Sequence, residues 1–455
     1  MTETESIIQP LTPPPSRRFS RSVGITLVAR AAQVVASLGA NILIARWLGE
    51  SGLGALAVIN VTMAVALQLA SLGLPSANVY FIAKDHRRLG PLWANTMLFG
   101  LLAGIGVAVL VAALVYVRPQ LFGEVPPRLL VIAVIAVPVQ FLTLVGLNLM
   151  LGLDRVIAYN LCDTLANSMS FVSAIITLIA FSGGLALLVY GNALGAILVG
   201  VTVSALIFKF WRQQTGHESL RPSGELFYHS LRYGLKFHLA ILANLLLVRI
   251  DLLLVNHYNG TREAGIYAAA AQIGTLLLLL PGVVSNLLFP RVAAEADRTG
   301  EFAMRVTRHL ALIMFLACVA TVPASLLLPI MYGAKFTPAV MLLLLLLPGV
   351  FLLGVESVLV QHFSGLGLPR AIPLFWLIAL AVNLALNFVF VPRFGAFAAA
   401  INSSIGYAII FVLVAVLFHR RTGNGFGRMF FLRRSEWSHL ADLLGRRNVL
   451  QDGDA

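Results

Sequence analysis

Residues 24–74 read GITLVARAAQVVASLGANILIARWLGESGLGALAVINVTMAVALQLASLGL. Two apolar runs, 24–47 and 54–74, fill almost all of this stretch. An α-helix rises about 1.5 Å per residue and needs about 20 apolar residues to cross the roughly 30 Å hydrocarbon core of a membrane. Both runs reach that length, and Gly49, Gly52 and Gly54 supply a tight turn between them. The stretch therefore predicts a hairpin of two membrane-spanning helices.

The same pattern continues along the chain to residue 418. Further apolar runs of similar length follow, and short polar segments separate them. We therefore expect an all-α polytopic membrane protein with twelve transmembrane helices, at 24–47, 54–74, 92–117, 129–152, 157–181, 186–209, 235–256, 266–289, 309–331, 339–362, 371–391 and 397–418.

The composition supports a membrane protein. Hydrophobic residues make up 59% of the 455 residues, charged residues make up 11%, and the mean hydropathy is +0.90. Soluble proteins carry about 25% charged residues, so this chain lacks the charged surface of a soluble enzyme or a disordered protein. The net charge of +13 is spread over short segments between apolar runs, which argues against a nucleic-acid-binding domain.

Lys and Arg gather on alternate connecting segments. With the N-terminus placed in the cytoplasm, the cytoplasmic segments hold 24 of the 32 Lys and Arg residues, and the opposite side holds six. The remaining two, Arg30 and Arg249, fall inside predicted spans. Because cytoplasmic loops of membrane proteins are enriched in these residues, we expect both termini in the cytoplasm.

The two halves of the chain echo each other. The turn Gly49–Gly54 is matched by Gly260–Gly265, 211 residues later, and the segment Gly152–Arg155 is matched by Gly367–Arg370, 215 residues later. Two marks in the same order with nearly the same offset indicate a duplicated unit of six helices. Since six is even, both units enter the membrane in the same sense, a layout typical of transporters with a cleft between two lobes.

This repeat predicts how the chain is organised. The expected parts are a cytoplasmic tail, a first lobe, a cytoplasmic linker, a second lobe and a basic cytoplasmic tail, at 1–23, 24–209, 210–234, 235–418 and 419–455. Within the last part, residues 428–447 alternate apolar side chains with Arg. That alternation predicts an interfacial helix on the anionic inner leaflet, with a disordered basic tail as the alternative.

Polar side chains form a stripe along each of two predicted spans. Their spacing places them within a narrow arc of a helix. Isolated Ser, Asn and Gln residues often hold membrane helices together. A stripe that includes an ionisable group is better explained by a water-filled cavity, because such groups are costly in lipid. We favour the cavity for both stripes, which are Arg30, Gln33, Ser37 and Asn41 in 24–47, and Asn160, Asp163, Asn167 and Ser170 in 157–181.

Three further ionisable residues lie in the second half. Arg249 and Asp251 are two residues apart, about 200° around a helix, so they cannot pair with each other on one helix. For Arg249, an ion pair between the lobes and a contact with substrate remain equal alternatives. For Asp251, Glu356 and the earlier Asp163, we expect either an ion pair between the lobes or a role in ion coupling.

Motifs for cofactors and metals are missing from the sequence. It contains neither GxxxxGK[ST] nor HExxH, and the two cysteines, Cys162 and Cys318, fit no metal-binding spacing. We therefore expect no cofactor, no metal and no ATP hydrolysis. The short segments on the outer side also leave little room for catalytic loops, which indicates a transporter rather than an enzyme.

Several motifs together resemble one family. Ala45–Gly49 followed by Gly52–Leu56 is similar to the opening of bacterial polysaccharide (O-antigen type) flippases. The second half repeats the likeness with the segments Leu231–Phe237, Val248–Asp251, Ala264–Ala270 and Leu288–Arg291. The order and spacing of these pieces, from about residue 20 to 418, carry the resemblance to this branch of the multidrug/oligosaccharidyl-lipid/polysaccharide exporter superfamily.

The resemblance implies a fold, a substrate and partners. The fold is the twelve-helix, two-lobe arrangement of multidrug and toxin extrusion transporters, and the family's Arg-x-Asp motif maps onto Arg249 and Asp251. The substrate is an undecaprenyl-diphosphate-linked oligosaccharide in the bacterial cytoplasmic membrane, with polysaccharide polymerases and glycosyltransferases as proteins acting beside the transporter. The related lipid II flippases usually carry two further helices, which the sequence lacks, so a peptidoglycan precursor is disfavoured.

Physical chemistry agrees with this substrate. Arg grips phosphate well, so Arg30 and Arg249 are expected to touch the diphosphate in inward-open and outward-open states, with Gln33, Ser37 and Asn41 lining the same cavity. The predicted function is a flippase for cell-surface or exopolysaccharide synthesis that works by alternating access. The alternatives are a drug or cation antiporter of the same fold and a membrane-embedded polysaccharide polymerase or glycosyltransferase.

Overall fold

The computed structural model describes residues 16–214, 216, 218–285, 297, 299–367 and 369–430. Within these ranges every regular element is a helix. The prediction of an all-α membrane protein is therefore confirmed. The interfacial helix predicted at 428–447 lies almost wholly outside the described residues, as does the segment Leu288–Arg291.

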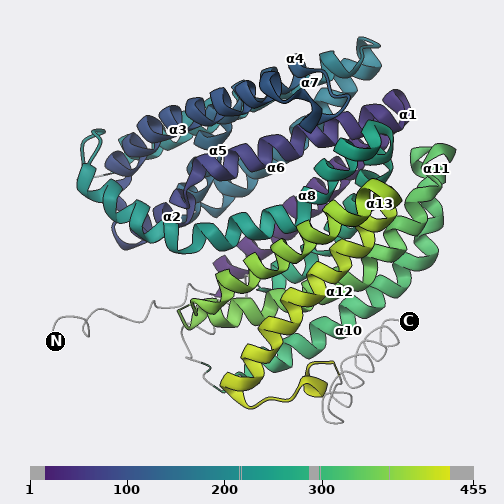
Figure 1. The fold of residues 1–455 in the computed structure, drawn as a ribbon. Coiled ribbons are helices and arrows are strands. Elements are labelled where there is room, and N and C mark those ends of the chain that lie inside the picture. The colour runs from purple at the N-terminus through teal and green to yellow at the C-terminus, as the bar shows by residue number, and fades with distance from the viewer. Residues whose placement is uncertain are drawn as a thin grey trace, which may run out of the picture.

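The first lobe is formed by the helices up to residue 213. They gather into one bundle, drawn from purple to blue in Figure 1. These helices are α1 (Ser16–Ser71), α2 (Leu74–Lys84), α3 (Leu89–Val117), α4 (Pro127–Ile135), α5 (Val137–Gly152), α6 (Val156–Ala174) and α7 (Leu185–Gln213).

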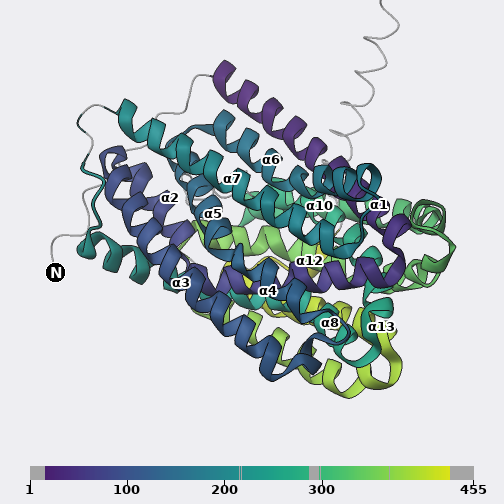
Figure 2. The same cartoon turned by 90° about the horizontal axis from the view of Figure 1, so that it is seen from above.

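The second lobe is formed by the helices from residue 224 onward. Its later helices make a separate bundle, drawn in green and yellow in Figure 1, and α8 runs along the boundary between the two bundles. In Figure 2, seen from above, the first-lobe helices lie in front of the green and yellow helices of the second lobe. The helices are α8 (Gly224–Leu277), α10 (Glu301–Ala324), α11 (Leu328–Tyr332), α12 (Pro338–Gly365) and α13 (Ala371–Thr422). The lobes meet mainly where α1 packs against α8.

Nine helical segments of the described chain are long and apolar enough to cross a membrane. Three of the longest helices contain one glycine with non-helical backbone angles, at Gly49 (φ 71°), Gly260 (φ 85°) and Gly395 (φ 57°). Glycine tolerates positive φ because it has no Cβ, so the chain bends sharply at these points. Counting the two arms of each bent helix separately gives the twelve spans expected from the sequence, although the continuous segments number nine.

The bends in α1 and α8 touch each other. A Cβ added to Gly54 would lie 1.8 Å from the carbonyl oxygen of Thr261, and one added to Gly265 would lie 1.8 Å from that of Glu50. Thr261 follows Glu50 by 211 residues, and Gly265 follows Gly54 by the same offset. The duplicated turns therefore pack as a two-fold pair, and only glycine permits this backbone approach. We call this side of the molecule the elbow end.

Two boundaries differ from the expected ones. α7 continues to Gln213 and α8 begins at Gly224, so the stretch between these helices is shorter than the expected linker at 210–234. α1 begins at Ser16 rather than at residue 24. All three helices extend into polar segments, which an apolar-run criterion leaves out because a helix can continue beyond the membrane.

Candidate functional site

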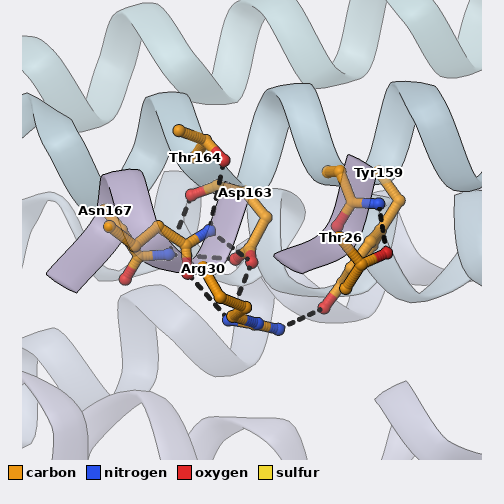
Figure 3. A network of polar contacts seen from close by, with 8 residues as sticks. Thr26, Arg30, Tyr159, Asp163, Thr164 and Asn167 are labelled. Carbon is orange, nitrogen blue, oxygen red and sulfur yellow. Dashed lines mark hydrogen bonds and ion pairs between the residues drawn. The ribbon is translucent and has the colours of Figure 1, made fainter. Parts of the chain in front are cut away.

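The predicted stripes on α1 and α6 face each other. Arg30 Nη1 lies 3.2 Å from Asp163 Oδ2 in an ion pair, and it also donates a hydrogen bond of 2.8 Å to Gln33 Oε1. Gln33 Nε2 in turn donates to Asp163 Oδ2 at 2.9 Å. Figure 3 shows Arg30 between Asp163 and Tyr159, whose hydroxyl is 3.5 Å from Arg30 Nη2. Arg30, Gln33 and Asp163 thus form one closed triangle inside the first lobe.

This triangle changes the interpretation of Asp163. The sequence left open an ion pair between the lobes, but the partner of Asp163 is Arg30 on another helix of the same lobe. Asn167 adds hydrogen bonds of 3.0 Å and 2.8 Å to the Asp163 side chain and backbone carbonyl. Asn160, the first member of the α6 stripe, donates to Thr26 on α1 at 2.9 Å. The stripes therefore tie α1 to α6.

A cavity of about 310 Å³ lies between the lobes. We call it the seam cavity. Its polar lining comes from both halves of the chain, and its members are Ser37, Asn41 and Asn60 on α1, Asn167 and Ser170 on α6, and Arg249, Tyr267 and Gln272 on α8. Gln272 also crosses the boundary directly, donating a hydrogen bond of 2.9 Å to Ser37 Oγ. Of the residues predicted to bind substrate, Ser37, Asn41 and Arg249 line this cavity, whereas Arg30 and Gln33 do not.

Arg249 is the charged group of the seam cavity. It is half-buried, and within the described part of the chain its guanidinium has neither a hydrogen bond nor an ion pair with protein. Arg30 lies elsewhere, since it does not line the seam cavity. Measured along the helices, Arg30 is about 28 Å and Arg249 about 16 Å from the bends at Gly49 and Gly260. The two arginines therefore occupy different depths.

Asp251 is fully buried in the second lobe. It accepts hydrogen bonds from Asn387 and Ser403, both on α13, and from the Tyr267 hydroxyl at 3.4 Å. These partners are neutral, so the structure gives Asp251 no ion pair within the described residues. Tyr267 lines the seam cavity as well, and therefore Asp251 lies directly behind the cavity wall. The sequence analysis named Tyr267 only within the motif Ala264–Ala270, and it singled out neither Asn387 nor Ser403 as a partner of Asp251.

Glu356 is not brought to this site. It is buried on α12, and its Oε1 has no hydrogen-bond partner among the described residues. It does not line the seam cavity. The grouping of Glu356 with Asp163 and Asp251 as possible coupling groups stays a prediction from the sequence.

A second cavity of about 440 Å³ lies inside the first lobe. We call it the first-lobe cavity. It is lined by residues of α1, α4, α5, α6 and α7, and it shares Asn60, Asn167 and Ser170 with the seam cavity, so the two spaces adjoin. Its other polar lining residues are Gln140, Thr143 and Asn192. None of these three was singled out from the sequence, because each is an isolated polar residue in an apolar run.

At the elbow end, ionic contacts join the two lobes. Arg262 Nε lies 3.1 Å from one carboxylate oxygen of Glu50, and Lys335 Nζ lies 4.0 Å from the other. In the contact related to these by the internal repeat, the Thr261 hydroxyl donates a hydrogen bond of 3.1 Å to the Glu124 carboxylate. Lys335 follows Glu124 by 211 residues, as Thr261 follows Glu50. These contacts are therefore related by the internal repeat.

A second pair of elbow contacts obeys the same relation. Arg46 Nε donates to the Met331 carbonyl at 2.7 Å, and His257 Nδ1 is hydrogen-bonded to the Gln120 carbonyl at 2.6 Å. His257 follows Arg46, and Met331 follows Gln120, by 211 residues. We call this whole set of contacts the elbow latch. Its contacts join the two lobes at the elbow end of the seam.

Comparison with known proteins adds three findings. A family model described as "Polysaccharide biosynthesis protein" matches residues 19–295. The chain is 27% identical over 180 residues to a Shigella flexneri protein described as "Putative O-antigen transporter". This aligned region covers 38% of this chain and 43% of the relative. It is also 27% identical over 160 residues to "Probable flippase AglR" of Haloferax volcanii, covering 33% of this chain and 34% of the relative. The matched region thus spans less than half of either relative.

Solved structures share the fold. The lipid II flippase MurJ in an inward closed conformation superimposes with a TM-score of 0.72 at 15% identity, covering 94% of this chain and 96% of that chain. An inward-facing multidrug resistance transporter of the MATE family superimposes with a TM-score of 0.71 at 13% identity, covering 88% and 98%. At these identities the likeness concerns the fold, and it agrees with the two-lobe architecture expected from the sequence.

Proposed function

Since the chain belongs to the polysaccharide biosynthesis protein family, we propose that it is a flippase for an undecaprenyl-diphosphate-linked oligosaccharide. The family membership confirms the resemblance drawn from the sequence motifs. In this proposal the protein resides in the bacterial cytoplasmic membrane with both termini in the cytoplasm. It moves the lipid-linked repeat unit from the inner to the outer leaflet for surface or exopolysaccharide synthesis.

One observation carries the proposal most directly. The seam cavity contains one charged lining residue among the described residues, Arg249, surrounded by neutral amides and hydroxyls. A diphosphate is anionic, and a guanidinium can donate two parallel hydrogen bonds to phosphate oxygens. Sugar hydroxyls both donate and accept hydrogen bonds, as the side-chain amides do. The chemistry of the cavity thus matches a head group that joins phosphate to sugar.

Arg30 offers an earlier contact for the same phosphate. It is held in place by Asp163 and Gln33, and 35% of its side chain remains exposed. A phosphate that approaches Arg30 competes with Asp163, so binding there is an exchange of one anion for another. Because Arg30 and Arg249 differ in depth, the head group would pass from the first to the second as it crosses.

The elbow latch supports a proposal of alternating access. By the distribution of Lys and Arg, the elbow end faces outward. The latch then closes the seam toward the outside, and outward opening must separate Arg262 from Glu50 and the duplicated turns from each other. The backbones pack closely at Gly54 and Gly265. Because a packed interface is bistable rather than continuously deformable, this interface is expected either to form fully or to separate.

The membrane potential can drive this movement. Carrying about two negative charges outward across roughly 100 mV, inside negative, is favourable by about 4–5 kcal/mol. Coupling to protons through Asp163, Asp251 or Glu356 is compatible with this arithmetic and is not required by it. We therefore propose a potential-driven flippase.

Reconstitution tests the function. The purified chain in liposomes should move an undecaprenyl-diphosphate-linked disaccharide between leaflets. A membrane potential that is negative on the cytoplasmic side of the protein should accelerate movement toward the opposite side. Protein-free liposomes and a cationic dye serve as controls. Export of the dye without movement of the lipid would identify a cation antiporter instead, and sugar transfer between added lipids would identify a glycosyltransferase.

A further inference from the structure

The first-lobe cavity has the chemistry of a site for a neutral polar ligand. Among the described residues its lining contains no Asp, Glu, Lys, Arg or His. Its polar groups are amides and hydroxyls, and the rest of its wall is aliphatic or Met. Its volume of about 440 Å³ falls within the range of about 300–1,000 Å³ that ligand pockets occupy.

Several of its polar groups have unused hydrogen-bonding capacity. Asn192 Oδ1 is buried without a hydrogen-bond partner, counted over the part of the chain that the structure describes. Over the same residues, the side chains of Gln140 and Asn60 form no hydrogen bond with protein. Buried polar groups are nearly always paired, so Asn192 Oδ1 calls for a ligand or water inside the lobe, and the half-buried Gln140 and the exposed Asn60 have amides available to the same ligand.

The position of the cavity relates it to the phosphate. It adjoins the seam cavity through Asn60, Asn167 and Ser170. Arg249 stands in the seam cavity, across this shared wall. This adjacency places Gln140 and Asn192 on the far side of Asn60 from a diphosphate that lies on Arg249.

We propose that the first-lobe cavity is the sugar-binding subsite and that it selects uncharged sugars. This inference rests on the proposed flippase function. Amides of Gln140 and Asn192 bond sugar hydroxyls, and the apolar wall packs against the C–H faces of the rings. An acidic sugar is rejected, because its carboxylate would enter a space without a cationic partner.

Two matched substrates test the selectivity. The full chain is reconstituted in liposomes with undecaprenyl-diphosphate-linked dihexose, or with the same lipid whose terminal hexose is replaced by hexuronic acid. The expected result is movement of the neutral lipid more than about tenfold faster than that of the acidic one. Equal rates, or a faster acidic lipid, would overturn the proposal. If neither lipid moves, the flippase function itself fails, and this inference falls with it.

Two variants test the residues. Gln140→Leu and Asn192→Leu each remove hydrogen-bonding groups at similar volume, and each should slow the neutral lipid about tenfold. Asn148→Leu is the matched control, since Asn148 is on α5 like Gln140 but bonds the Leu144 carbonyl rather than lining the cavity. Full rates in both cavity variants would contradict the assignment. The comparison of the two lipids on the unaltered chain stands even if a variant fails to fold.

Discussion

Arg249 and Asp251 are two residues apart on α8 and lie in opposite environments. The Arg249 side chain lines the seam cavity, whereas Asp251 is fully buried and accepts hydrogen bonds from Asn387 and Ser403 on α13. The Arg-x-Asp motif thus combines a group available to a ligand with a group committed to the second lobe. The first predicted consequence concerns stability rather than transport.

Asp251→Leu should destabilise the protein by roughly 3 kcal/mol. The substitution removes the buried carboxylate that accepts hydrogen bonds from Asn387, Ser403 and Tyr267, and a lost hydrogen bond to a charged group costs about 1.5–3 kcal/mol. Asn387 keeps its bond to Asn383, and the Tyr267 and Ser403 hydroxyls still bond each other, so the total stays near the lower end of the sum. Thermal unfolding in detergent measures the effect. Arg249→Leu is the control and should change stability by less than about 1 kcal/mol, because Arg249 has no bonded partner in the described structure. The reverse ranking of the two variants would refute the assignment.

Gly54→Val should open the elbow end. A Cβ at this position meets the Thr261 carbonyl oxygen at 1.8 Å, and backbone on both sides leaves no room for adjustment. With Asn41→Cys as a reporter in the seam cavity, a membrane-impermeant thiol reagent added from the elbow side should label the variant at least about tenfold faster. Gly106→Val is the matched control, since a Cβ there meets nothing within 4 Å. Equal labelling of the two glycine variants would argue against a latch.

The Glu50–Arg262 pair should contribute little to stability by itself. The Glu50 side chain is only 9% exposed, but the Arg262 side chain is 71% exposed, so water screens the pair from the Arg262 side, and screened ion pairs are worth about 0–1 kcal/mol. A double-mutant cycle with Glu50→Gln and Arg262→Gln should therefore give a coupling below about 1 kcal/mol, and less at high salt. A coupling several times larger and insensitive to salt would mean that the ion pair, rather than the glycine packing, holds the elbow end.

Asp163→Asn should strengthen binding of a diphosphate. It removes the anion that competes for Arg30 while Asn keeps a hydrogen-bonding group beside Gln33. Binding of farnesyl diphosphate to the purified chain should tighten several-fold, on the order of 1 kcal/mol, and Arg30→Ala should weaken it. Asp154→Asn, on an exposed residue with φ 58° that Asn tolerates, is the control. Unchanged affinity in both Asp163→Asn and Arg30→Ala would show that Arg30 does not bind the diphosphate.

The sequence predicted the spans and the repeat because both leave local marks. Apolar runs set the helices, and the glycines at 49–54 and 260–265 mark turns that the structure places against each other. The offset of 211 residues also relates Arg46 to His257, although the two side chains differ in chemistry. The repeat thus preserved the geometry of the latch while its residue types changed.

The candidate site was only partly predictable. Spacing on α1 and α6 gave the two stripes, since their members share a helix face. It did not reveal that Arg30 is paired with Asp163, because the relative rotation of two helices is set by packing between distant segments. For the same reason Ser403, 152 residues from Asp251, left no sign in the sequence. The polar residues of the first-lobe cavity stand alone in apolar runs, so only the fold brings them together.

The most direct test is the rate at which the reconstituted chain flips undecaprenyl-diphosphate-linked dihexose when Arg249 is changed. Arg249→Ala should lower the flipping rate about ten- to hundredfold, because it removes a hydrogen bond to a charged group. Arg249→Lys should retain part of the rate. Arg393→Ala, which removes an exposed arginine outside the seam cavity, should leave the rate unchanged. A full rate in Arg249→Ala, at equal protein and equal stability, would contradict a phosphate grip in the seam.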